Sequence, residues 1–302
     1  MAEPAGKDAT TILVAGHESA EGADVRYLEQ ARNRWFVTPI GRPLHNLLTR
    51  HLSSGDGPIV VVPMTMGRNP TLVADTAKTV QWLAAGAPER LALAAPFGSP
   101  DHLISWLRLA ATGIRSRSSD AAMVIQAPSS DPFDEAELHR VAHLVRTHGA
   151  GNVVEVATTH TDDDLVGVLQ RLRRLGHPHA VVVPAGFRRE SPVPLDDSRF
   201  TGSEFYGPLM SEQAAIRIID ARIRDAVHEL AHGRTGVESG LMADHGHGYA
   251  HSHAFDDSSD SAHGHGHGHG HGHGHEHGHQ SRAGDDPGTE HSHRHPAAAS
   301  SH

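Results

Sequence analysis

The feature that most constrains the fold is an internal repeat. The string Pro58-Ile-Val-Val-Val-Pro63 returns as His179-Ala-Val-Val-Val-Pro184, at an offset of 121 residues. Around each string the same order of short apolar runs and amphipathic stretches also returns, which is typical of a duplicated structural unit. Strands that alternate with helices form parallel sheets covered by helices on both faces. The sequence therefore predicts an α/β protein made of a tandem pair of domains with a cleft between them.

The first domain is assigned to residues 9–115 and is the shorter of the two. Its predicted strands are 11–15, 59–63 and 91–95, and its predicted helices are 43–52, 70–85 and 100–111. Between the first two of these strands the pattern is ambiguous, with a short helix at 26–32 and a short strand at 35–37 as candidates. The polar segment 112–120 is interpreted as a linker.

The second domain is assigned to residues 121–233. Its predicted strands are 122–126, 152–157 and 179–184, and its predicted helices are 135–147, 163–175 and a last one that ends near 231. In this domain a turn and helix-cap composition, Pro128-Ser-Ser-Asp-Pro132, stands where the first domain has Gly16-His17-Glu18-Ser19.

The third region, 240–302, is rich in histidine and glycine and is predicted to be disordered, because its composition cannot form a packed core. Its most regular part alternates the two residue types and contains His263, His265, His267, His269, His271, His273, His275, His277 and His279. Imidazoles on a flexible chain bind Ni²⁺, Cu²⁺ and Zn²⁺ well and Co²⁺ more weakly. An inert linker and a purification tag are the alternatives; the spread of histidines over most of this region argues against a tag.

Composition excludes several classes of function. The chain has no cysteine, so it contains no disulfide, thiolate metal site or cysteine-ligated iron–sulfur cluster, and any metal ligand must be His, Asp, Glu or water. A net charge of −10 argues against a nucleic-acid partner. No stretch approaches the roughly 20 apolar residues of a membrane span, and the N-terminus has no apolar signal core. We therefore expect a cytoplasmic protein.

His17 is the first candidate for chemistry. It follows the predicted strand 11–15 directly, and the carboxyl ends of strands are where open α/β sheets place their sites. A neutral imidazole binds Co, Ni, Zn or Fe and also accepts a proton near neutral pH. The alternative is an ordinary capping or surface histidine.

Two groups of motifs resemble a known family. Leu13-Val-Ala-Gly-His17-Glu-Ser19, Val60-Val-Val-Pro63 with the following Gly67-Arg-Asn69 and Asp75, and Ala95-Pro-Phe-Gly98 are similar to the first half of the class II tetrapyrrole chelatases. Ser129-Ser-Asp-Pro132, 176–184 and Gly207-Pro208 resemble the second domain of the two-domain sirohydrochlorin cobaltochelatases. The resemblance spans nearly all of residues 11–230.

This resemblance implies two chelatase-like three-layer domains and a lyase-type metal chelatase. Its expected reaction is the ATP-independent insertion of Co²⁺ into sirohydrochlorin for cobalamin biosynthesis, with the metal gathered by the histidine-rich tail. It makes His17 a catalytic and metal-binding residue and places Asn69 at the family's second histidine. Arg68 and Ser19 are then expected to bind the tetrapyrrole substrate; for Arg68, a solvated surface residue is the alternative.

The sequence departs from the family pattern in three places. Asn69 replaces a histidine, Ala127 stands at the histidine position of the second domain, and the segment between His17 and Val60 is shorter where the family carries an acidic site residue. His45, His102 and His160 are possible substitute ligands or, alternatively, surface residues. These departures leave two further interpretations: a chelatase for Ni²⁺ or Fe²⁺, and a degenerate chelatase fold that acts as a metal store or metallochaperone.

Overall fold

The computed structural model describes residues 9–87, 89–194 and 197–243. The predicted disordered region, 240–302, starts too early, because residues 240 and 241 belong to a helix that spans Val237–Leu241. Its remainder from residue 244 onward, with all nine of its regularly spaced histidines, lies outside the described residues. No helix in the described part of the chain is both long and apolar enough to cross a bilayer.

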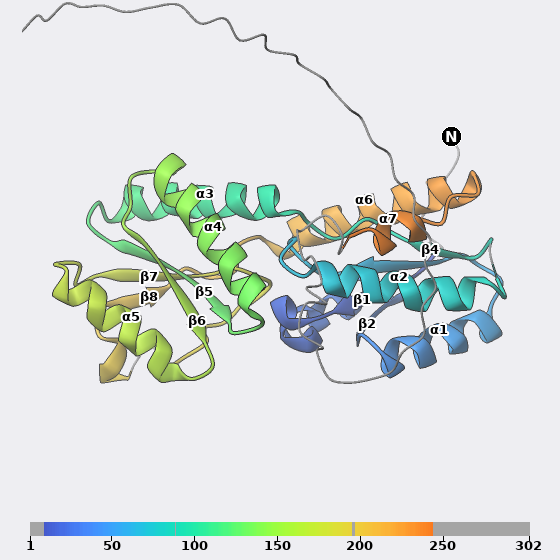
Figure 1. The fold of residues 1–302 in the computed structure, drawn as a ribbon, viewed down its shortest axis with the longest axis horizontal. Helices are drawn as coiled ribbons and strands as arrows, with labels where there is room; N and C mark the ends of the chain where they lie inside the picture. Colours follow the sequence, from blue (N-terminus) through green and yellow to red (C-terminus); the bar gives the residue numbers. More distant parts are fainter. Residues whose placement is uncertain (1–8, 88, 195–196, 244–302) are drawn as a thin grey trace, which may run out of the picture. The chain divides into compact units, whose positions relative to one another are not determined.

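Two four-stranded parallel sheets form the body (Figure 1). The first has the order β2-β1-β3-β4 and contains β1 (Thr10–Ala15), β2 (Trp35–Pro39), β3 (Ile59–Pro63) and β4 (Leu91–Leu93). The second has the order β6-β5-β7-β8 and contains β5 (Ala122–Pro128), β6 (Val154–Thr159), β7 (Ala180–Pro184) and β8 (Ser203–Phe205). The identical strand order confirms the predicted α/β fold and its duplication.

Helices connect these strands. They are α1 (Arg42–Ser54), α2 (Pro70–Ala84), α3 (Pro100–Arg117), α4 (Pro132–His148), α5 (Asp162–Arg174), α6 (Glu212–Ala231) and α7 (Val237–Leu241), with short 3₁₀ segments η1 (His17–Gln30) and η2 (Ser198–Phe200). Several begin at a side chain that accepts a backbone N–H, for example Asn69 for α2, Asp131 for α4 and Ser211 for α6. Such caps satisfy N–H groups that have no partner within the helix.

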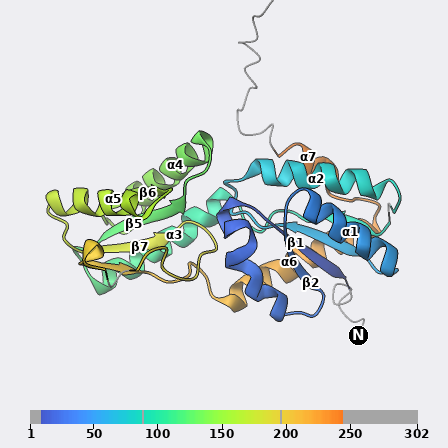
Figure 2. The same cartoon turned by 90° about the horizontal axis from the view of Figure 1, so that it is seen from below.

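Alternating side chains of each strand enter different cores, which gives each sheet three layers. In β1, Ile12 and Val14 pack in the core that contains residues of α1, α2 and α7. Leu13 and Ala15 face the other way, into the core that contains residues of η1 and α6. Figure 2 shows α2 and α6 on opposite sides of this sheet.

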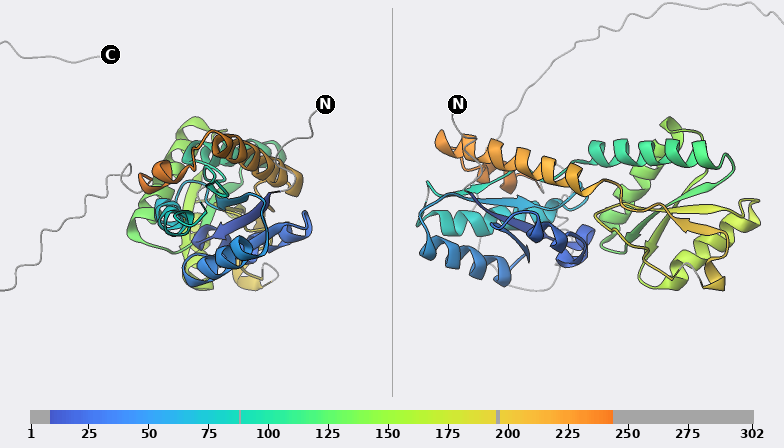
Figure 3. Two further views of the ribbon diagram at one scale, coloured as in Figure 1. Left: turned by 90° about the vertical axis from the view of Figure 1, so that its right-hand side faces the viewer. Right: turned by 180° about the vertical axis from the view of Figure 1, so that it is seen from behind.

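The last helix of each repeat packs on the sheet of the other repeat. Helix α3 follows the first sheet but contacts α4 and β7, whereas α6 follows the second sheet but contacts β3 and β4. Figures 1 and 3 show α3 beside the second sheet and α6 beside the first. The ranges 9–115 and 121–233 therefore describe the repeat along the sequence. In space, each sheet is covered in part by a helix from the other range.

The predicted linker at 112–120 is wrong over most of its length, because α3 continues to Arg117. Ser99 and the N3 residue His102 form a capping box that starts this helix. Ile114, near its other end, is 1% exposed, so burial of an apolar side chain stabilises a segment whose composition is otherwise polar.

Candidate functional site

His17 lies just beyond the carboxyl end of β1, where the chain enters η1. The turn before it is glycine for a steric reason: a Cβ on Gly16 would lie 2.8 Å from Nδ2 of Asn69. The predicted partners His17 and Asn69, 52 residues apart, are in fact neighbours, because β1 and β3 pair in parallel and end at the same edge of the sheet.

Asn69 determines which nitrogen of His17 carries the proton. Its Oδ1 accepts the backbone N–H of Leu72 at 2.9 Å, as the cap of α2, so its Nδ2 is the atom directed at the imidazole. Nδ2 donates to Nδ1 of His17 at 2.9 Å. Nδ1 is then an acceptor, and the proton of the neutral ring is on Nε2.

The second ring nitrogen faces an acidic residue of the other repeat. Nε2 of His17 lies 3.4 Å from Oδ1 of Asp134, a residue in the first turn of α4 that is only 2% exposed. The distance is that of an ion pair, and among the described residues neither Nε2 of His17 nor Oδ2 of Asp134 has a hydrogen-bond partner. An imidazolium at His17 would therefore have a buried carboxylate beside it.

Arg68 connects the same carboxylate to the protein interior. Its Nη1 donates to Oδ1 of Asp134 at 2.6 Å and its Nη2 to the carbonyl of Ala185 at 3.1 Å. Its Nε lies 3.9 Å from Oε2 of Glu18, and its side chain has no exposed surface. The guanidinium predicted to bind a substrate carboxylate thus has two protein carboxylates as its neighbours, and the surface alternative is wrong.

Glu18 and Ser19, the two residues that follow His17, are both buried. Glu18 is 3% exposed and accepts hydrogen bonds from the Thr65 hydroxyl and from the backbone N–H of Met66, the latter at 3.0 Å. Ser19 is fully buried, and its hydroxyl donates to the carbonyl of Gly16 at 3.1 Å. That hydroxyl therefore stabilises the turn, and in this conformation it does not reach solvent.

The two repeats meet at this cluster through their strand ends. The N–H of Phe187, in the loop after β7, donates to the carbonyl of Glu18 at 3.2 Å, and the rings of Phe97 and Phe187 lie 5.0 Å apart, edge to face. Beside the cluster is a hollow of 260 Å³. It is lined by Gly67, Arg68, Pro70, Phe133, Ala136, Glu137 and Arg140, which belong to both repeats.

The cluster supplies one imidazole and two carboxylates but no ready-made metal cage. Within the described ranges there is no group of three His, Asp or Glu side chains that could hold a metal ion. His45, His102 and His160 do not provide one, and Nδ1 of His102 accepts the N–H of Ser99 in the cap of α3. The arrangement is suited to accepting a proton at His17 and stabilising the resulting charge.

Sequence reasoning missed Asp134. It lies two residues beyond the Ser129–Pro132 motif, at the start of a helix, where acidic residues are common for reasons of helix stability alone. No pattern distinguishes a carboxylate that faces another repeat from one that only stabilises its own helix. A carboxylate therefore lies beside His17, and it is contributed by the second repeat.

No known protein family matches the sequence, and no curated protein matches it either. Among solved structures, SirB from Bacillus subtilis with Fe³⁺ has a TM-score of 0.50 and 14% identity, covering 75% of this chain and 98% of that chain. The sirohydrochlorin chelatase SirB from Bacillus subtilis subspecies spizizenii, in complex with cobalt, has a TM-score of 0.41 and 15% identity, covering 76% and 97%. The predicted chelatase-like fold is therefore confirmed: this chain shares the fold of SirB.

Proposed function

We propose that this protein inserts a divalent metal ion into a tetrapyrrole of the sirohydrochlorin class, without ATP. One observation carries the proposal: in a SirB-like fold, His17 lies at the junction of the two repeats with Asn69 on one ring nitrogen and Asp134 near the other. Co²⁺ is the proposed metal substrate, and Ni²⁺ and Fe²⁺ are alternatives with similar ligand preferences. The Fe³⁺ bound to SirB agrees with metal handling in this fold.

The proposed chemistry concerns two pyrrole protons, which must leave before the metal can occupy the macrocycle. The lone pair on Nδ1 of His17 accepts one of them once the Asn69 amide turns aside: the pyrrole N–H bond breaks, its electron pair stays on the pyrrole nitrogen, and an N–H bond forms at Nδ1. The second proton passes to solvent water. The imidazolium is stabilised by Asp134, which is held in turn by Arg68. General-base catalysis of this kind contributes about 10²–10⁴-fold.

Substrate access requires the cluster to open. His17 is 19% exposed, and Arg68–Asp134 and Glu18–Phe187 contacts join the repeats around it. With so little of the imidazole exposed, we propose that the macrocycle reaches it when those contacts separate. The proposed catalytic cycle therefore includes an opening of the repeats, in which the histidine-rich tail outside the described residues supplies metal to the cleft.

The test is insertion by the purified full chain, followed by the absorbance change of sirohydrochlorin on addition of Co²⁺. We expect His17→Ala to lower the rate by about 100-fold or more, because the base is removed. Ser129→Ala, at the corresponding position of the second repeat, is the matched control and should remain within twofold. Equal rates for His17→Ala and wild type would show that the site is wrongly assigned.

A second function, a metal store or metallochaperone, is favoured by one observation. Asn69 stands in place of a histidine, and the described part of the chain has no three-residue metal group. Deleting all residues after Asp244 separates the two functions. For a chelatase, insertion at saturating Co²⁺ is unchanged and falls only when the metal is scarce; for a store, the deletion removes most of the bound metal and sirohydrochlorin is never metallated.

A further inference from the structure

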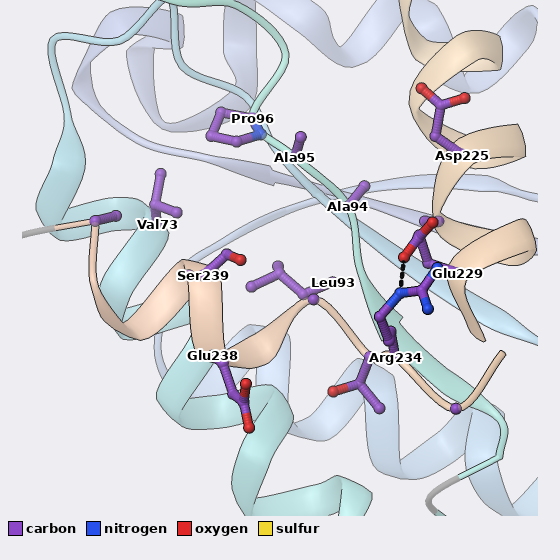
Figure 4. Close-up of a pocket in the computed structure, with 16 residues that line it drawn as sticks. Val73, Leu93, Ala94, Ala95, Pro96, Asp225, Glu229, Arg234, Glu238 and Ser239 are labelled. Atoms are coloured by element: carbon purple, nitrogen blue, oxygen red, sulfur yellow. Dashed lines mark hydrogen bonds and ion pairs between the residues drawn. The ribbon is translucent and has the colours of Figure 1, made fainter.

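A second hollow, of 530 Å³, lies between β4, α2, α6 and α7 (Figure 4). No residue of the His17 cluster lines it. Its apolar surface comes from residues such as Val73 and Leu93, and its polar rim from α6 and α7. The rim carries Asp225, Glu229, Arg234, Glu238 and Ser239. A cavity of this size, with an apolar floor and a few polar groups, is typical of a binding site.

The segment between α6 and α7 shapes this hollow. The N–H of Leu93 donates to the carbonyl of Thr235 at 2.8 Å, so the segment crosses the end of β4. Gly236 follows with φ of 74°, and a Cβ there would lie 2.1 Å from the carbonyl oxygen of Leu93. Only glycine fits this close crossing, which separates α7 from α6 and leaves the space between them open.

The rim of the hollow has an excess of negative charge. Arg234 pairs with Glu229, as the dashed line in Figure 4 marks. Asp225 and Glu238 are exposed, and among the described residues neither has a hydrogen-bond or ion-pair partner. An occupant of this hollow should therefore combine an apolar or aromatic group with donors or positive charges beside it.

We propose that the occupant is a segment of this same chain, residues 244–253, at the start of the histidine-rich tail. Ala243, the last described residue before the tail, lines the hollow itself. The sequence that follows is Asp244-His-Gly-His-Gly-Tyr-Ala-His-Ser-His253. It supplies one aromatic ring, Tyr249, for the apolar floor and four histidines for the carboxylates, and it does so independently of the proposed chelatase function.

Apolar burial, hydrogen bonds to carboxylates and tethering all favour this docking. A buried tyrosine removes about 150–250 Å² from water. Imidazole N–H groups donate to carboxylates, and the bond is stronger when the ring is protonated. Because the segment is tethered at the edge of the hollow, its effective concentration there is on the order of millimolar, so weak contacts suffice.

The absence of cysteine permits a direct test on the full chain. Ala95→Cys introduces a thiol on the exposed wall of the hollow, and Ala250→Cys one beside Tyr249. A disulfide forms only when the two Cα atoms approach within about 7 Å. The rate of intramolecular disulfide formation with diamide, in the presence of a chelator, is read by mass spectrometry after digestion.

We expect rapid cross-linking, slowed at least tenfold by Tyr249→Ser and, separately, by Asp225→Asn with Glu238→Gln. Leu175→Cys, exposed on the second repeat, replaces Ala95→Cys in the control pair and should link at least tenfold more slowly. Unchanged thermal unfolding of the rim variants shows that the body remains folded. Rates within twofold of each other for the parent pair and both variants, or equally fast linking of the control pair, would overturn the proposal.

Discussion

The ends of β1 and β5 occupy equivalent places in their sheets but carry different chemistry. After β1 the chain has His17 and Glu18, within hydrogen-bond or ion-pair reach of Asn69 and Arg68. At the end of β5, Gln126 Nε2 donates to the Thr159 hydroxyl at 2.8 Å. Gln126 pairs with Pro184 as Val14 pairs with Pro63, so Ser129 corresponds to His17, and the expected position, Ala127, corresponds to Ala15. The duplication thus preserved the strand order and not the site.

The segments that follow β1 and β5 also differ between the two repeats. Between β1 and β2 the first repeat has only η1, in which Ala20 and Glu21 have positive φ, whereas the second repeat has the 17-residue helix α4 between β5 and β6. Asp134, in the first turn of α4, is the residue that approaches His17. The second repeat, which has no histidine at the end of β5, therefore contributes a carboxylate beside the histidine of the first.

The largest predicted effect concerns the ion pair between the repeats. Asp134→Ala leaves the Arg68 guanidinium buried with only the more distant Glu18 beside it, and breaking a buried pair costs about 3–5 kcal/mol. Urea unfolding measures the change in the free energy of unfolding. Glu137→Ala, on the same helix, removes an exposed pair with Arg140 and should cost less than about 1 kcal/mol. Similar costs for the two variants would mean that the repeats do not depend on this contact.

Most strands and helices could be predicted because their signals are local, whereas β2 was only a candidate and the three-residue strand β8 was missed. Ile59–Pro63 is an uninterrupted apolar run, and α2 has apolar residues at helical spacing with a proline in its first turn. The proximity of His17 to Asn69 follows from parallel pairing of two strands that end together. Each of these inferences uses only neighbouring residues or one general rule of sheets.

Long-range packing could not be predicted in the same way. Helices α3 and α6 each pack on the sheet of the other repeat. Because either sheet offers an apolar surface to an amphipathic helix, the sequence of the helix does not show which sheet it covers. Arg68 is a polar residue in a loop sequence, and only the fold shows that two carboxylates neutralise it in the interior. The same holds for Asp134, which is 66 residues from Arg68.

A smaller effect is expected where the loop after β7 contacts the first repeat. A Cβ on Gly186 would lie 2.5 Å from the carbonyl oxygen of Glu18, so Gly186→Ala forces the two backbones apart at a cost of about 1–3 kcal/mol. Faster hydrogen exchange at the N–H of Phe187 should accompany the loss. Gly167→Ala is the matched control, because this exposed helical position has no atom near the added methyl and should gain about 0.5–1 kcal/mol. A Gly186→Ala protein as stable as wild type would indicate that this contact is not maintained in solution.

The smallest effect tests the contact between η1 and the same loop through Asp24. Burial raises the pKa of Asp24 above 3.8, Glu190 adds to the rise, and Arg188 opposes it. Because the pKa is higher in the folded state, the contribution of Asp24 to stability is fully present below its unfolded pKa and is lost as pH rises through the folded value. Asp24→Asn should therefore stabilise the protein at pH 7, by less than about 1 kcal/mol for a partly exposed group, and the difference should vanish near pH 3. Asp56→Asn, in an exposed turn of the first repeat, is the control and should change the free energy of unfolding at pH 7 by less than about 0.5 kcal/mol. If Asp24→Asn were destabilising at pH 7, the attraction between the Asp24 carboxylate and Arg188 would outweigh the cost of burying its charge. The contact between η1 and the second repeat would then be stabilised by this charge pair.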